Sequence, residues 1–223
     1  MKKTIILAAM LALPTFAGQK VIVNPAPVAP VAPAVASPWS IELAATYTWG
    51  VPDIHKYTSP CKEIKSIGAD ITGVYAIDEN NAVTLRFGYT WGGEKFANAS
   101  LFGFDVEGWE KVRIHTFSLM PGYRYTSPIC DQLSWFVGAN VGVANASYKY
   151  SIYSQEQRLL SMHNAAWGFA YSAEIGLRYE LTESLDVFCA YQYGGNTARA
   201  KKYGLHAKRQ HGHTARVGVG IKF

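Results

Sequence analysis

Apolar and polar positions alternate over most of the chain, from residue 39 to residue 223. In the first such segment Ile41 and Leu43 share one face, and Glu42 lies on the other. A period of two predicts β-strands that have one apolar face and one small or polar face. We predict eight strands, at residues 40–49, 66–77, 82–91, 116–125, 133–143, 165–179, 185–194 and 214–223.

The fourth strand has the weakest pattern. Val112 and Ile114 lie on the opposite parity from Phe117 and the apolar positions that follow it. A β-bulge shifts the alternation by one residue, so either a bulge or a loop that extends this far would explain the switch.

The connections between the predicted strands alternate in length. Three are short and turn-like, at residues 78–81, 127–132 and 181–184. Four are long, at residues 51–63, 92–110, 149–162 and 195–210. An up-and-down meander with turns at one end and long loops at the other is typical of a bacterial outer-membrane barrel.

Periodicity alone does not say which face points outward, and a soluble lipocalin-like barrel would enclose its apolar face. The polar face is rich in Gly, Ala, Ser and Thr and contains very little Lys, which is unusual for a surface in water. Aromatic residues also gather near both ends of the apolar face, such as Trp39 and Tyr75 at one end and Trp91 and Tyr193 at the other. Two aromatic belts that flank an aliphatic band favour contact with lipid. We therefore predict an all-β, eight-stranded antiparallel transmembrane β-barrel with a filled polar interior.

The predicted interior carries four acidic and four basic side chains. These are Glu42, Asp70, Glu174, Asp186, Arg86, Arg124, Arg178 and Arg216. Buried charges are costly unless they are paired, so we expect these groups to pair across the lumen. A catalytic or proton-relay role is the alternative, but balanced charges spread over seven strands favour structural filling and a closed, non-conducting lumen.

The first 38 residues have a different composition from the rest. Residues 1–17 combine Lys2 and Lys3, an apolar stretch and a small-x-small site ending at Ala17, which is the pattern of a secretory signal peptide rather than of a short buried helix. Residues 18–38 are rich in Pro, Ala and Val and are predicted to form a semi-rigid spacer, although such a segment could also bind a partner domain. The barrel would then comprise residues 39–223.

Charge and composition narrow the class of protein further. Only 17% of the residues are charged, against about 25% in an ordinary soluble domain. Removal of residues 1–17 would leave 19 basic and 16 acidic side chains, a formal charge of +3. This charge is too small to indicate a nucleic-acid-binding protein.

The chain resembles the small eight-stranded outer-membrane β-barrel superfamily, which includes the OmpA membrane domain, the OmpX/Ail-type proteins and the opacity-type porins and adhesins. The resemblance covers residues 39–223 and includes the last segment, HTARVGVGIKF. It implies an outer-membrane location, with the spacer in the periplasm and the long loops outside the cell. It also implies that the barrel-assembly machinery reads the terminal pattern, which is Val217, Val219, Ile221 and Phe223 in this chain.

Candidate catalytic and metal-binding residues give little support for an enzyme. His115 and Ser118 resemble the His-x-Ser arrangement of lipid A deacylases of this class, but they are one residue too far apart. They therefore fall on opposite faces of the strand. His211 and His213 share a face, but no acid lies nearby to complete a metal site. We expect no catalytic residues, cofactor or metal, and we expect Cys61, Cys130 and Cys189 to be free thiols.

The last long loop is strongly basic. It contains three histidines, no Asp or Glu, and the basic residues Arg199, Lys201, Lys202, Lys208 and Arg209. Such a cluster attracts phosphate or carboxylate polymers. The expected partner is lipopolysaccharide, and a host or matrix glycan is the sharper alternative; a solvated loop without a specific ligand is also consistent with this composition.

These observations predict a monomeric outer-membrane barrel with a structural or surface-interaction role, in envelope integrity or adhesion. A narrow channel for small solutes and a lipid A-modifying enzyme are the two competing function classes.

Overall fold

The computed structural model describes residues 37–50, 52–55, 65–101, 104–154, 157–202 and 205–223. The predicted signal peptide and nearly all of the predicted spacer lie outside these residues. Within the described ranges no helix is long and apolar enough to cross a membrane.

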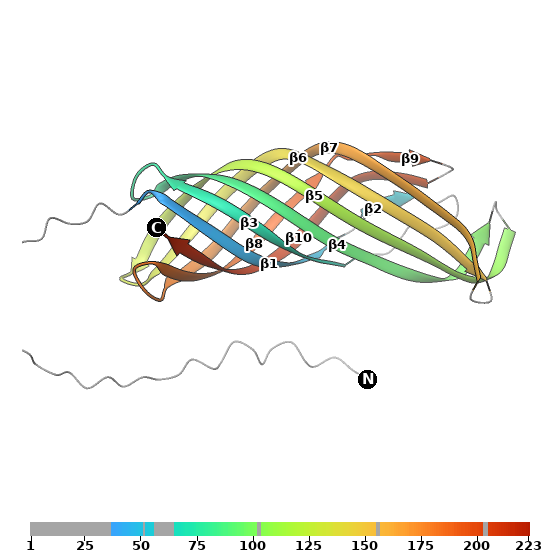
Figure 1. Ribbon diagram of the computed structural model, residues 1–223, viewed down its shortest axis with the longest axis horizontal. Coiled ribbons are helices and arrows are strands. Elements are labelled where there is room, and N and C mark those ends of the chain that lie inside the picture. Colours follow the sequence, from blue (N-terminus) through green and yellow to red (C-terminus); the bar gives the residue numbers. More distant parts are fainter. Residues whose placement is uncertain (1–36, 51, 56–64, 102–103, 155–156, 203–204) are drawn as a thin grey trace, which may run out of the picture. The chain divides into compact units, whose positions relative to one another are not determined.

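The described residues form one antiparallel sheet whose first and last strands pair, so that the sheet closes into a barrel (Figure 1). The ring consists of β1 (Trp39–Trp49), β3 (Ser66–Ala76), β4 (Asn81–Leu101), β5 (Phe104–Cys130), β6 (Leu133–Ser154), β7 (Gln157–Glu180), β8 (Leu185–Asn196) and β10 (Leu205–Lys222). Two short strands, β2 (Pro52–His55) and β9 (Ala200–Lys202), pair with the beginning of β10. Each ring strand pairs with its neighbours in the chain, which confirms the predicted eight-stranded up-and-down topology.

The predicted boundaries of two long loops are wrong. Residues 92–110 and 149–162 belong largely to β4, β5, β6 and β7, which pair to within a few residues of their turns. Figure 1 shows these four strands running beyond the others at the end away from the short turns. The two-residue alternation continues in these segments, but here apolar side chains face inward and charged or polar ones face outward. Strands that are recognised by their outward apolar residues are therefore predicted to end too early.

The predicted irregularity in the fourth strand is also wrong. The register between β4 and β5 is continuous from Asn81↔Tyr125 to Ala97↔Trp109, so no bulge separates Val112 from Phe117. Val112 and Ile114 are buried inside the barrel, whereas Phe117 is exposed on its outside. The parity is constant along β5, and the interior changes from polar to apolar.

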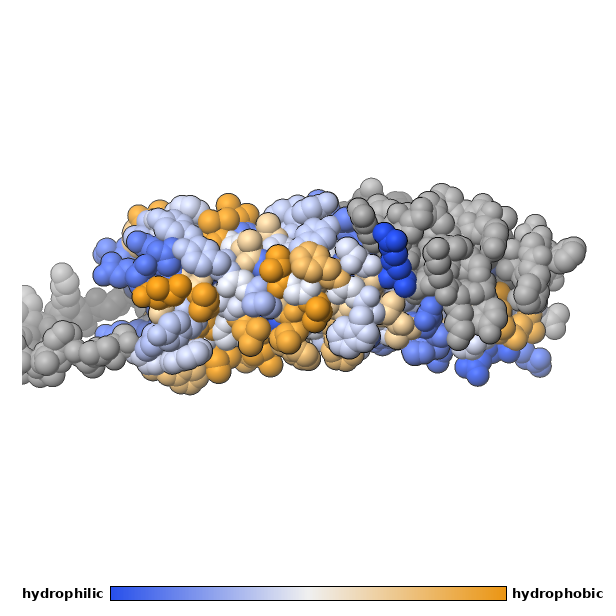
Figure 2. Space-filling view, turned by 90° about the horizontal axis from the view of Figure 1, so that it is seen from above, coloured by the Kyte–Doolittle hydropathy of each residue, from blue (hydrophilic) through white to orange (hydrophobic). Residues whose placement is uncertain are grey.

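Apolar side chains cover the outside of the barrel over most of the ring. Leu43, Leu85, Val141 and Val219 are among the large hydrophobic residues exposed there. Figure 2 shows hydrophobic side chains gathered over the middle of the visible face, with hydrophilic ones at either side. The prediction that the apolar faces of the strands point outward is therefore confirmed.

Aromatic side chains lie at both ends of this apolar band. We call the set near the short turns the turn-side girdle, comprising Trp39, Tyr75, Tyr123, Tyr125, Trp135, Tyr179 and Phe223. The opposite set is the loop-side girdle, comprising Tyr47, Trp49, Tyr89, Trp91, Trp167, Phe169, Tyr191 and Tyr193. Rings on neighbouring strands contact each other at both levels. The Trp39–Tyr75 pair of the turn-side girdle has ring centroids 4.8 Å apart, and Tyr89 of the loop-side girdle contacts Phe117 with centroids 4.7 Å apart.

Candidate functional site

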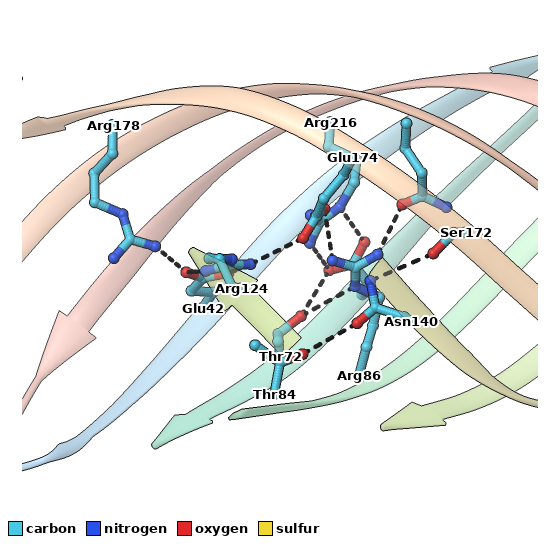
Figure 3. Close-up of polar contacts among 12 residues, drawn as sticks. Glu42, Thr72, Thr84, Arg86, Arg124, Asn140, Ser172, Glu174, Arg178 and Arg216 are labelled. Carbon is cyan, nitrogen blue, oxygen red and sulfur yellow. Dashed lines mark hydrogen bonds and ion pairs between the residues drawn. The ribbon is translucent and has the colours of Figure 1, made fainter. Parts of the chain in front are cut away.

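The barrel interior holds a connected set of charged side chains, here called the ionic cluster. It comprises Glu42, Asp70, Arg86, Arg124, Glu174, Arg178 and Arg216 (Figure 3). These residues come from β1, β3, β4, β5, β7 and β10. Strand alternation turns each of them inward, because their neighbours in sequence occupy the outer face.

Glu174 lies at the centre of the ionic cluster. Its Oε2 accepts hydrogen bonds from Arg86 Nη2 at 2.7 Å and from Arg216 Nη1 at 2.5 Å, and its Oε1 accepts one from Arg124 Nη2 at 3.2 Å. One carboxylate from β7 thus bridges guanidinium groups from β4, β5 and β10. It connects strands that are not neighbours in the sheet.

Two further carboxylates extend the ionic cluster. Glu42 accepts hydrogen bonds on both oxygens from Arg124, and one from Arg178. Asp70 accepts two from Arg216, at 2.6 Å from Nη2 and 3.0 Å from Nε. Planar, forked contacts of this kind hold both partners in one geometry, which suits arginine better than lysine.

Asp186 is the predicted interior acid that the structure does not join to this hydrogen-bonded set. Its Oδ1 lies 3.5 Å from Arg178 Nε, and neither carboxylate oxygen has a hydrogen-bond partner among the described residues. The interior position of Asp186 agrees with the alternation, but its pairing is looser than that of Glu42 and Asp70.

Two aromatic rings that the sequence analysis did not select complete this region. Phe136 is fully buried, with the guanidinium of Arg124 4.7 Å from its ring centroid. Phe188 is 3% exposed and lies under Arg216 at 5.5 Å. Phe136 is two residues from Gly138 and Phe188 is two residues from Asp186, so each ring lies on the inward face of its strand. This position in the alternation is the signal by which the sequence could have identified them as interior residues.

Neutral polar side chains surround the arginines. Arg86 donates to Gln192 Oε1 at 2.8 Å and to Thr72 Oγ1 at 3.4 Å. Thr84 donates to Asn140 Oδ1 at 3.1 Å. On the loop side of these contacts a cavity of about 160 Å³ is lined by small polar residues such as Thr90 and Ser118.

Beyond this cavity the interior becomes apolar. The apolar cluster comprises Val112, Ile114, Ala146, Tyr148, Tyr150, Ile152 and Ala198. These residues come from β5, β6 and the segment after β8, and Leu160, Met162 and Ala166 of β7 pack against them. The lumen is thus occupied by charged groups at one level and by hydrocarbon side chains at the next.

The predicted basic loop is described only in part. Lys201 and Lys202 lie in β9, and Lys208 and Arg209 lie in β10, so four of its five cations belong to paired strands. Arg199 is exposed. The side chains of the other four lie outside the described set, so their mutual arrangement remains a prediction.

The residues of the predicted assembly signal lie on the outside of β10 and just after it. Val217, Val219 and Ile221 are exposed on the outer face, and Phe223 is 64% exposed in the turn-side girdle. The backbone N–H of Phe223 donates to the carbonyl of Trp39 at 3.3 Å. The signal residues therefore border the seam at which β10 meets β1.

The candidate catalytic pair is not assembled. Ser118 has the inward parity of Met120, and His115 has the outward parity of Phe117. His115 Nδ1 lies 2.8 Å from the hydroxyl of Tyr89 in the loop-side girdle.

The histidines and cysteines considered as metal ligands or thiols do not come together in one site among the described residues. His211 Nδ1 lies 2.7 Å from the Tyr171 hydroxyl, and His213 stacks on Trp49 with centroids 6.0 Å apart. Among the residues that the structure describes, no group of His, Cys, Asp or Glu side chains could hold a metal ion. Cys130 and Cys189 are exposed free thiols, and Cys61 lies outside the described residues.

Comparison with known proteins agrees with this geometry. Residues 25–223 match the family model "Outer membrane protein beta-barrel domain". A curated relative from Leptospira interrogans, an uncharacterized 35 kDa protein in the sph 3' region, is 30% identical over 94 residues, which are 41% of this chain and 31% of that protein. The match therefore spans less than a third of the relative's length.

Several solved structures are similar to this chain. Neisserial surface protein A is 14% identical, with a TM-score of 0.50 over 85% of this chain and 100% of that one. OprG from Pseudomonas aeruginosa is 14% identical, with a TM-score of 0.48 over 84% and 97%. Ail of Yersinia pestis, solved with the heparin analogue sucrose octasulfate, is 16% identical, with a TM-score of 0.47 over 83% and 97%. Because the family match includes the whole barrel, the chain belongs to the outer membrane protein β-barrel domain family, whose members are bacterial outer-membrane proteins.

Proposed function

We propose that this outer-membrane protein acts through its outer surface and loops, in envelope integrity or adhesion, and does not conduct solutes. The filled interior is the observation that supports this proposal. The ionic cluster connects the walls of the barrel, and the apolar cluster occupies the same lumen further along. Because both levels are packed with side chains, an extended ion path would require both to rearrange.

Conductance tests the closed lumen directly. Purified full-length protein inserted in a planar bilayer should give no discrete current steps above the background of protein-free membranes. Steps that persist after repurification, and that change in size in a Glu174→Ala variant, would replace the proposal with a channel. The matched control is Glu180→Ala, which removes a carboxylate that pairs with Lys222 outside the ionic cluster.

The basic fourth loop is the proposed contact for polyanions. Its five cations lie within residues 199–209, and the same segment contains no Asp or Glu. Phosphate or sulfate polymers would release counter-ions from such a segment, and their binding should weaken as the salt concentration rises. Lipopolysaccharide beside the barrel and sulfated glycans outside the cell both offer this chemistry.

Cells that express the protein should bind immobilised heparin, with binding lost when the five cations are replaced together by Gln. The substituted residues are Arg199, Lys201, Lys202, Lys208 and Arg209. The control replaces the exposed Arg158 of β7 by Gln, which should leave binding unchanged. Full binding by the fivefold variant, with equal surface amounts of protein, would eliminate the adhesive role of this loop.

We also propose that residues 1–17 are removed on export and that residues 18–38 form a periplasmic spacer. The charged start, apolar stretch and Ala17 support this proposal. The intact mass of protein isolated from outer membranes should correspond to a chain that begins at residue 18. A mass that includes Met1 would eliminate the signal peptide.

A further inference from the structure

A second basic surface lies on the outside of the barrel, just beyond the loop-side girdle. Lys95 of β4, Lys111 and Arg113 of β5, and Lys149 of β6 have the parity opposite to that of buried interior residues. Lys65, immediately before β3, is exposed beside them. We call these five side chains the strand-face cations. They belong to a different part of the chain from the basic fourth loop.

The strand register places like charges directly opposite each other. Lys95 is the cross-strand partner of Lys111, and Arg113 is the partner of Lys149. Cross-strand neighbours on one face are about 5 Å apart, and like charges in this position destabilise a sheet. Anions from another source would relieve the repulsion within two such pairs.

The neighbouring carboxylates do not supply these anions. Glu94 precedes Lys95 and Glu110 precedes Lys111, and both have the inward parity. Glu110 is buried, whereas Glu94 is partly exposed and borders the groove described below, but no ion pair joins it to these cations among the described residues. Within the described part of the chain, none of the strand-face cations forms an ion pair. Lys95 instead lies over the ring of Trp109, with its Nζ 4.7 Å from the ring centroid. The arginines of the interior, in contrast, all meet carboxylates.

These cations border an open groove of about 550 Å³ on the barrel surface. Its charged and aromatic lining comprises four cations and one carboxylate together with His115 and Trp91; the charged residues are Lys65, Lys95, Lys111, Arg113 and Glu94. Gly93 lies opposite Arg113 and contributes no side chain, which leaves the guanidinium accessible. A Cβ at Gly93 would lie 2.5 Å from the carbonyl oxygen of Val112, so close approach of β4 and β5 maintains this bare floor.

The groove adjoins the apolar band. Trp91 and Ile67 line the groove and are each about half exposed, and Phe117 is exposed two residues from His115. Figure 2 shows the same change on the visible face, where hydrophilic side chains follow the hydrophobic band. A ligand that meets both surfaces must carry anionic groups above and hydrocarbon chains below.

We propose that the strand-face cations bind the phosphorylated headgroup of an acylated outer-leaflet lipid. Arg113 and Lys111 would contact phosphate oxygens, since a guanidinium fork matches phosphate geometry and an ammonium adds a point charge. The acyl chains of the same lipid would lie on Ile67 and Trp91. Binding relieves the repulsion within the two like-charged pairs and fixes the height of the barrel in the outer leaflet.

The probe is diphosphorylated lipid A added to the full-length protein in neutral detergent micelles, with bound lipid measured by native mass spectrometry. Removal of both phosphates from the lipid should weaken binding by about tenfold or more. Equal binding of the two lipids would overturn the assignment. Inorganic pyrophosphate should bind much more weakly than lipid A, and equal affinity for pyrophosphate would remove the lipid from the proposal.

A fourfold Gln variant locates the site. It combines Lys95→Gln, Lys111→Gln, Arg113→Gln and Lys149→Gln. Its affinity for diphosphorylated lipid A should fall about tenfold or more, because the phosphates lose their counter-charges. Replacement of the three lysines by Arg, with Arg113 retained, should preserve binding. Unchanged affinity in the Gln variant would overturn the proposal.

The matched control compares two single substitutions that each remove one exposed arginine. Arg113→Gln should weaken lipid A binding, whereas Arg158→Gln, in β7 and outside the groove lining, should change the affinity by less than about twofold. An equal loss in both variants would reduce the site to general electrostatic attraction. Folding of each variant is verified by the electrophoretic mobility of unheated samples, in which a folded barrel migrates differently from the heated chain. If the fourfold Gln variant does not fold, the double variant Lys111→Gln and Arg113→Gln replaces it.

Discussion

The barrel interior contains two regions that are equally buried and chemically opposite. Between the girdles, Glu42 and Arg124 are each 1% exposed and are held by ion pairs. Beyond the loop-side girdle, Ala146 and Ile152 are 0% and 2% exposed and have apolar neighbours. Burial alone therefore does not determine which residues fill this lumen.

The outer face changes in the opposite sense. Around the ionic cluster it carries residues such as Leu43 and Val219, whereas around the apolar cluster it carries Lys111 and Arg113. Each level places on its outside the side chains that suit the surroundings there, lipid for the first and water with headgroups for the second. At each level the interior carries the opposite class of side chain from the outer face, and interior side chains that are charged must be paired.

The largest effect expected within this comparison follows from Glu174→Ala. Three arginines would lose a shared carboxylate, and an unpaired buried charge costs about 3 to 5 kcal/mol. Urea unfolding in phospholipid vesicles, followed by tryptophan fluorescence, should give a free energy of unfolding lower by that amount. Glu180→Gln, at the partly exposed pair with Lys222, should change it by less than about 1 kcal/mol. Equal effects would contradict the special role of the interior pairs.

Ile152→Ala examines the apolar region. Truncation of a buried isoleucine costs about 2 to 4 kcal/mol, and the loss should be confined to the ends of β5 and β6. Hydrogen exchange should speed up at these backbone amides and stay unchanged around Glu42 and Glu174. Faster exchange throughout the barrel would show that the two interior regions unfold as one unit.

Phe136→Leu examines an aromatic ring that packs within the ionic region, under Arg124 and Arg178. The loss of the ring contact with Arg124 should lower the free energy of unfolding by about 1 to 2 kcal/mol. Phe169→Leu, on the lipid face, should have a smaller effect because both side chains are apolar there. The same urea titration checks both variants, and an equal loss would indicate that ring size alone matters.

The smallest effect concerns a carboxylate outside both regions. Asp78 in the turn between β3 and β4 accepts hydrogen bonds from the backbone amides of Asn80 and Asn81, each at 2.8 Å, and from the Asn81 side chain. These contacts, chiefly the Asn81 side-chain bond, hold the pKa of Asp78 below its usual value of 3.8.

Because the pKa is depressed in the folded state, this turn is stabilised above about pH 4, and the contribution is lost as the pH falls through the folded pKa. Asp78→Asn should therefore give a slightly lower Tm at neutral pH and the wild-type Tm in strong acid. A difference in Tm that persists unchanged in acid would contradict the role of the ionised carboxylate.

The alternation along the chain was sufficient to predict the barrel. Val217, Val219 and Ile221 show why, because a two-residue period with one apolar face admits few arrangements when the other face carries little charge. The same reasoning placed Glu42, Arg86 and the other interior charges inside. It failed at Val112 and Ile114, where the period is intact but the apolar and polar faces exchange places as the surroundings change.

The pairing inside the lumen could not be derived from the sequence. Arg86 and Glu174 lie 88 positions apart on β4 and β7, and their contact depends on the diameter and stagger of the barrel. Phe136 was missed for a related reason, since a large ring on a glycine-rich face is visible only as an exception to the pattern. A Cβ at Gly176 would lie 2.5 Å from Cζ of this ring, so the two positions determine one volume together.

The seam between β1 and β10 has a consequence for biogenesis. The first ring strand pairs with the last along ten consecutive positions, from Ser40↔Lys222 to Trp49↔His213. Until β10 has been synthesised and delivered, β1 has an open edge, and an open edge recruits other chains. The nascent polypeptide must therefore be kept from aggregating during transit, and insertion must be coupled to closure of the ring.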